Sequence, residues 1–133
     1  MRTGQAALPL VLVICGIIIE IAIAGVFVAF ILSNSGWGER LSAQALAAAK
    51  AGQEDAFIKI TLNKNFTSTN YSFSVDSQSV NVTITKDPVG YPAGTAQIIS
   101  VGKALTRQRK LEGIVLISQN NGKVDLKSLK EIQ

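Results

Sequence analysis

The sequence predicts an α+β fold in which a long N-terminal helix, an apolar stalk continuing into an alanine-rich amphipathic helix, packs on a small antiparallel β-sheet. Three observations carry this prediction: residues 6–32 are almost entirely apolar, residues 38–60 are rich in helix-forming residues, and apolar and polar residues alternate from residue 71 onward. Apolar residues on one face of a helix recur every three to four residues, whereas strict alternation of apolar and polar residues is typical of half-buried strands. With 133 residues the chain is long enough for one core and too short for two.

The composition excludes most enzyme chemistry. The chain has no histidine, which removes Ser-His-Asp and Cys-His catalysis and histidine-ligated metals. Its single cysteine, Cys15, excludes intrachain disulfides and cysteine-rich metal sites. We therefore expect a non-enzymatic protein with no catalytic residue, no cofactor and no metal. The net charge of +4 favours anionic neighbours without naming a partner.

The apolar segment has the length of a membrane-spanning helix. At about 1.5 Å per residue it extends about 40 Å, against about 30 Å of bilayer hydrocarbon. It is too long for the apolar region of a secretory signal, and no small-residue cleavage site follows it. Arg2 and the terminal amine precede it, whereas Glu39 and Arg40 cancel after it, so the N-terminus is expected in the cytoplasm and the remainder outside.

Glu20 is the only charged residue within the apolar segment. An acidic residue at the centre of a membrane helix costs about 2.5–3.5 kcal/mol, so Glu20 needs a partner. Two interpretations stay open. In a lone helix the carboxyl group is protonated and forms local hydrogen bonds. In a stack of identical helices with an axial offset, Glu20 pairs with the cationic end of a neighbour, Arg2, which lies about 27 Å along the helix.

Small residues in the same segment allow close helix packing, as contacts between helices in an apolar environment require. They are Gly16, Ala22, Ala24 and Gly25. The alternative interpretation is that glycine and alanine are simply common in membrane helices.

Residues 33–38 interrupt the apolar pattern with Gly36 and Gly38 and three short polar residues. These residue types disfavour a helix interior, so we expect a hinge or a locally unwound stretch, with Trp37 at the boundary between membrane and water. A second helical section follows over residues 38–60. Its spacing predicts one face of mostly small side chains packed on a sheet or on another helix: Leu41, Ala45, Ala48, Gly52, Ala56 and Ile60.

The rest of the chain predicts three to five antiparallel strands. A small sheet cannot bury both faces, so one face is expected on the preceding helix. Alternating residues place strands at 71–75, 80–84, 95–103 and 107–118. Turn-forming residues place a hairpin turn at 76–79, a loop at 87–94, and a last turn at 120–122 before a short tail.

The order of these segments resembles that of the type IV pilins and pseudopilins. Arg2 and Gly4 ahead of the apolar run, and the alanine-rich segment 38–52, carry the resemblance. It implies four parts along the chain: a leader peptide at 1–4 that is cut between Gly4 and Gln5, a membrane and filament-core helix at 5–32, a hinge at 33–38, and a head domain at 39–133.

The resemblance also implies a function. The precursor would lie in the cytoplasmic membrane, and an assembly machinery would polymerise identical copies into an extracellular helical filament used in adhesion. In this family a glutamate usually occupies the fifth position after the cut; here that position is Pro9, and Glu20 is the only acidic residue available to replace the glutamate. The alternative is a low-copy minor pilin or pseudopilin that primes a secretion or DNA-uptake machine or binds a ligand.

Two surface signals complete the sequence. Residues 106–110 form a basic run that fits nucleic acid, but no aromatic residues are interleaved, and lysine and arginine also protect sheet edges, which we favour. Asn65, Asn70 and Asn81 each begin an Asn-X-Ser/Thr sequence, the pattern of N-glycosylation. Chance matches are expected in a region so rich in serine and threonine, so both interpretations stay open.

Overall fold

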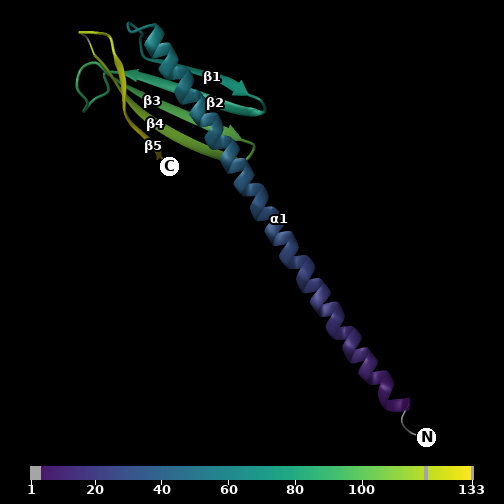
Figure 1. The fold of residues 1–133 in the computed structure, drawn as a ribbon. Helices are drawn as coiled ribbons and strands as arrows, with labels where there is room; N and C mark the ends of the chain where they lie inside the picture. Colours follow the sequence, from purple (N-terminus) through teal and green to yellow (C-terminus); the bar gives the residue numbers. More distant parts are fainter. Residues whose placement is uncertain (1–3, 119, 133) are drawn as a thin grey trace. The chain divides into compact units, whose positions relative to one another are not determined.

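The structure is a computed structural model that describes residues 4–118 and 120–132. It has the predicted α+β fold: one long helix and a five-stranded antiparallel sheet (Figure 1). The elements are α1 (Gly4–Leu62), β1 (Thr69–Val75), β2 (Gln78–Lys86), β3 (Thr95–Ala104), β4 (Arg107–Ile117) and β5 (Val124–Ile132). By their internal contacts the residues form two compact units that divide after Gly38.

The helix α1 is continuous through residues 33–38, so the locally unwound stretch expected there is wrong. Ser35 Oγ donates a hydrogen bond to the carbonyl oxygen of Leu32 at 3.0 Å, which pairs the hydroxyl within the helix itself. Gly36 and Gly38 each lower helix stability by about 1 kcal/mol relative to alanine. Because helix formation is cooperative, the long helical segments on both sides offset this cost. Hinge bending at these two glycines stays a prediction.

The five strands form a meander in the order β1-β2-β3-β4-β5. The first turn is shorter than expected, because Val75 pairs with Gln78 and leaves only Asp76 and Ser77 between the strands. Asp76 takes φ = +55°, a left-handed conformation that aspartate adopts more readily than most residues.

The expected short tail is wrong, because residues 124–132 form the strand β5. Ile114 pairs with Ser128 and Val115 with Leu126, so Lys127 is an extra residue at a β-bulge. The bulge shifts the inward side chains from even to odd positions within one strand. Simple alternation therefore does not reveal β5 in the sequence.

The second unit has its core between α1 and one face of the sheet. The predicted helix face lies on that sheet face: its members from Ala45 to Ile60 are buried, and Leu41 is half-buried. The sheet contributes mainly β-branched side chains: Val80, Val82, Ile84, Ile98 and Val115.

Glycine brings the helix and the sheet very close together. A Cβ atom on Gly52 would collide with Ser100 Oγ and lie 2.7 Å from Val80 Cγ1. A Cβ atom on Gly102 of β3 would collide with the backbone of Ala45 and Ala49. At both positions a Cβ atom would lie closer to its neighbours than real Cβ atoms do. Gly52 and Gly102 are therefore required for space rather than for backbone conformation.

Candidate functional site

The apolar part of α1 is the main candidate site. Over residues 7–32 every side chain is exposed, and the large apolar ones range from 48% for Ile14 to 71% for Val26. By length and composition α1 can cross a membrane. Soluble domains rarely leave such a large contiguous apolar surface open to water, so this surface is suited to lipid or protein neighbours.

Glu20 lies between two small residues on one face of this helix. Gly16 and Ala24 are four residues before and after it, and residues four apart lie above one another on a helix. No atom beyond the helix's own turns lies within 4 Å of the Cβ position at Gly16. A second chain can therefore approach the backbone beside the Glu20 carboxyl group.

The other two small residues lie on a different face. Ala22 and Gly25 are three residues apart and lie roughly opposite Glu20 around the helix. Ala22 also lines a shallow hollow of about 430 Å³ whose walls include Phe27 and Phe30. The four predicted packing residues thus form two faces, one around Glu20 and one around Ala22, rather than a single stripe.

The predicted N-terminal processing site is placed only in part. Gly4 and Gln5 are the first residues of α1, where the structure describes the backbone but not the surroundings of these residues, and Arg2 lies outside the described residues. Cleavage between Gly4 and Gln5 and pairing of Glu20 with Arg2 therefore stay predictions.

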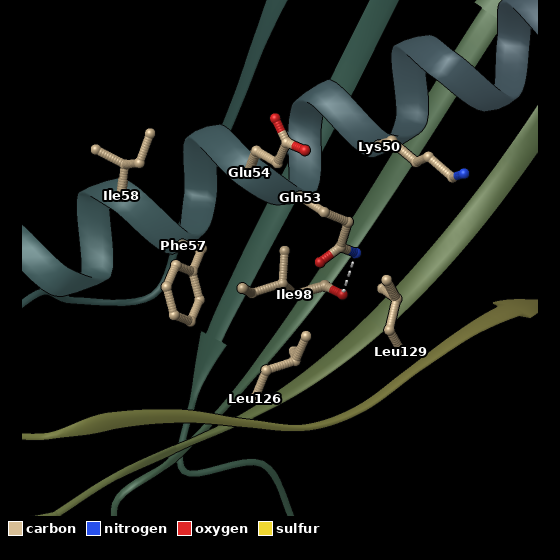
Figure 2. A pocket seen from close by; sticks show the side chains of 8 residues that line it. All are labelled: Lys50, Gln53, Glu54, Phe57, Ile58, Ile98, Leu126 and Leu129. Atoms are coloured by element: carbon tan, nitrogen blue, oxygen red, sulfur yellow. Dashed lines mark hydrogen bonds between the residues drawn. The ribbon is translucent and has the colours of Figure 1, made fainter.

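The second unit contains an apolar groove between α1 and β5 with a volume of about 500 Å³. Leu126 and Leu129 of β5 face the same space as Phe57 of α1 (Figure 2). Ile58 borders the groove with 57% of its surface exposed, and Lys50 and Glu54 place one charge of each sign at the rim. The groove suits apolar groups, since its floor offers few free polar atoms.

Gln53 forms the polar part of the groove floor. Its buried side chain donates hydrogen bonds to the carbonyl oxygens of Ile98 and Leu111, both at 3.0 Å. Figure 2 shows the first of these bonds. Gly113 provides the space, because a Cβ atom there would lie 2.5 Å from Gln53 Oε1. The sequence reasoning missed this residue, although Gln53 lies directly beside the predicted packed face.

A second polar cluster joins α1 to the edge strand β1. Tyr71 donates a hydrogen bond to Asp55 Oδ2 at 2.5 Å, and Lys59 Nζ lies 2.8 Å from the same oxygen and 3.5 Å from the centre of the Tyr71 ring. Burial alone would raise the pKa of Asp55, but the hydrogen bonds from Lys59 and Tyr71 outweigh it and hold the pKa below its usual value. Burial and the bond to Asp55 raise the pKa of Tyr71.

Glu112 is a buried carboxylate that the sequence reasoning also missed. It lies on the sheet face that points away from α1, where Lys130 Nζ binds its Oε2 at 2.9 Å and Gln97 donates to its Oε1. These two hydrogen bonds lower the pKa of Glu112. The cluster ties β3, β4 and β5 together and leaves the carboxylate satisfied, which indicates a structural role.

The basic run 106–110 does not form one basic patch. Strand geometry sends its residues to alternating faces of β4. Arg109 binds Ser42 Oγ on α1 through Nε at 2.8 Å and Glu131 Oε1 on β5 through Nη1 at 2.7 Å. Its guanidinium is thus occupied within the chain, whereas Lys110 points to the opposite face. The basic side chains of this run therefore lie on both faces of the sheet rather than on one, and nucleic-acid binding stays untested.

The three Asn-X-Ser/Thr sequences differ in setting, although all three asparagines are exposed. Asn65 lies in the turn that follows α1, whereas Asn70 and Asn81 lie in β1 and β2. Asn70 pairs with Thr83, and Ser72 pairs with Asn81, so two of the sequences lie crosswise on the sheet face turned away from α1. Glycosylation stays a prediction at each position.

Among the residues that the structure describes, no group of three or more His, Cys, Asp and Glu side chains lies close enough together to hold a metal ion. Comparison of the chain with family models, with curated proteins and with solved structures finds no match.

Proposed function

We propose that the chain is a structural subunit of an extracellular filament of the type IV pilus kind, assembled by lateral packing of the apolar segments of many copies. One observation carries the proposal: residues 7–32 expose a continuous apolar surface, while residues 39–132 contain a complete core of their own. The head needs nothing from the apolar segment, so that segment is free to pack against other molecules.

The details of the segment favour protein over lipid as its final neighbour. Each isoleucine, leucine or valine side chain moved out of water into a bundle contributes about 1.5–3 kcal/mol, so a bundle outside the membrane is stable once formed. Glu20 has a low-cost environment in a bundle, where a neighbouring chain supplies a cation, and a costly one in lipid. Gly16 and Ala24 give that neighbour access to the carboxyl group.

The proposal includes a route. The precursor lies in the cytoplasmic membrane with its N-terminus inside, a peptidase removes residues 1–4, and an assembly machinery moves the chain into the filament. The mass of the N-terminal peptide tests the first step, since a chain that begins at Gln5 supports processing and one that keeps Met1 contradicts it.

Shearing tests the filament itself. Intact cells that produce the full chain are sheared, and the chain is quantified in the cleared supernatant and in the membrane fraction. A filament subunit is released in quantity as long polymers visible by electron microscopy. A chain that stays wholly in the membrane fraction contradicts the proposal.

The groove between α1 and β5 favours a second candidate, a low-copy membrane protein of the same architecture that binds a ligand or primes a machine. About 500 Å³ of mostly apolar space fits a small apolar group. Retention in the membrane fraction after shearing, together with a low copy number, is the outcome expected for this candidate.

A further inference from the structure

We infer that β1 is a self-pairing edge, through which two copies of the chain join their sheets across a twofold axis. The starting observation is a difference between the two edges of the sheet. At one edge, β5 carries a bulge at Lys127 and a second lysine, Lys130, and bulges and lysines hinder strand addition. At the other edge, β1 runs for seven residues without a bulge, a proline or a charged residue.

The backbone of β1 offers a regular set of outward hydrogen-bonding groups. Val75 and Gln78 flank a two-residue turn and form the pair that closes it, so alternate residues from Val75 back to Thr69 bond to β2. The backbone N–H and C=O groups of Asn70, Ser72 and Ser74 therefore point away from β2, toward the open edge of the sheet. In the described part of the chain β2 is the only strand beside β1, and no backbone hydrogen bond reaches these three residues from elsewhere.

One antiparallel register uses all three outward residues. It places Ser72 opposite Ser72 of the second copy and Asn70 opposite Ser74 at both ends. On the α1 side, Tyr71 then faces Phe73 of the other copy twice, and aromatic pairs across strands are favourable. On the other side, serine faces serine and asparagine faces serine. The sequence of β1 is thus complementary to itself.

The charges at the ends of β1 fit the same register. It sets the exposed Asp76 of one copy beside Ser68 of the second copy. The strand β1 itself carries no charged residue, so no like charges face each other along the paired strands.

This contact differs from the packing proposed for the filament. Copies in a filament of parallel helices are related by a screw axis, whereas β1 pairing requires a twofold axis. The two copies joined by β1 therefore belong to different filaments or are not yet assembled. Pairing through β1 would link filaments side by side. The pairing itself does not depend on whether the apolar segments polymerise.

Disulfide trapping tests the pairing on the full chain in detergent micelles, with Cys15→Ser removing the native thiol. Ser72→Cys places two thiols on residues about 5.5 Å apart between Cα atoms, within disulfide range. Ser128→Cys is the matched control, because Ser128 is exposed on the same sheet face at the opposite edge. Under mild oxidation we expect roughly tenfold more linked dimer from Ser72→Cys, since only thiols on Cα atoms within about 7 Å can join. Equal amounts from the two variants overturn the inference.

Mixing experiments test the register. Asn70→Cys chains mixed with Ser74→Cys chains should link to each other more than either links to itself. Linking of Ser72→Cys chains to Ser128→Cys chains would show head-to-tail pairing of β1 with β5 and overturn the twofold arrangement.

A charge variant provides a readout without cysteine. Ser72→Lys places two like charges opposite each other at the twofold axis and should lower the dimer association constant about fivefold, whereas Ser128→Lys should leave it unchanged. Analytical ultracentrifugation in micelles measures both. An unchanged constant for Ser72→Lys, or a wild-type chain that is wholly monomeric at high concentration, contradicts self-pairing.

Discussion

Gly52 of α1 lies directly over Ser100 of β3, so close that a Cβ atom on Gly52 would collide with the serine oxygen. Helix propensity favours alanine over glycine by about 1 kcal/mol at this position, and the packing opposes it. We predict that Gly52→Ala lowers the free energy of unfolding of the head by about 1–3 kcal/mol, the usual range for overpacked cores.

Gly36→Ala is the control for this prediction. Gly36 lies in the same helix, and no atom beyond the adjacent residues and the helix's own backbone lies within 4 Å of its Cβ position. Alanine there should leave thermal unfolding unchanged or raise its midpoint, because only propensity acts. Thermal melts of both variants, followed by the circular dichroism of the sheet, make the comparison. Equal melting temperatures for the two variants would show that the contact at Gly52 is looser than described.

The apolar segment gives a second prediction. If the proposed filament pairing is right, Glu20→Gln and Glu20→Ala should both reduce filament yield while leaving membrane insertion intact, because each removes the charge that the pairing needs and neither makes the segment less apolar. Glu39→Gln is the control, since Glu39 lies beyond the apolar segment. Sheared filament and membrane-bound chain are quantified for each variant. Normal yield from both Glu20 variants would exclude the pairing.

The cluster around Asp55 predicts acid sensitivity. The pKa of Asp55 is lowered in the folded chain, so its contribution to stability is fully present above about pH 4 and is lost as the pH falls through the lowered folded value. Asp55→Asn should therefore flatten the dependence of the unfolding midpoint on pH below pH 4. Melts from pH 7 to pH 2.5 measure the slope, and Glu54→Gln, an exposed neighbour, is the control. An unchanged slope in Asp55→Asn would assign the acid sensitivity to other carboxylates.

Arg109 and Arg107 separate a structural role from a nucleic-acid role. Arg109 joins Ser42 and Glu131, and both partners are partly exposed, so Arg109→Ala should cost about 1 kcal/mol of stability. Arg107→Ala should change stability by less than about 0.5 kcal/mol, as is usual for exposed residues. Urea unfolding measures both variants. If each variant instead leaves stability unchanged and weakens binding to DNA, the basic run is a nucleic-acid site.

Much of the fold follows from periodicity alone. The hairpin of β1 and β2 is readable because its side chains alternate without interruption. The strand β5 is not readable, because the bulge at Lys127 changes the phase of its apolar residues. Residues 33–38 mislead for another reason: their composition disfavours a helix locally, whereas helix formation is cooperative and the flanking segments decide.

The candidate site divides in the same way. An exposed apolar segment can be recognised from length and hydropathy, and Glu20 can be recognised as its one charge. The roles of Gln53 and Arg109 cannot be recognised, because their partners lie between 22 and 67 residues away along the chain. The partner proposed for Glu20 belongs to a neighbouring chain, and a single sequence does not contain the arrangement of copies.

The close contacts at Gly52, Gly102 and Gly113 have a mechanical consequence. Gly52 fits against the side chains of β2 and β3, and Gly102 and Gly113 receive the backbone of α1 and the side chain of Gln53. Because each of these groups fits into a space left by a glycine, the sheet cannot slide along residues 45–56 of the helix without first separating from them. A pulling force along α1 would thus act as shear on the whole contact between the helix and the sheet, and all of its close contacts would resist the force together.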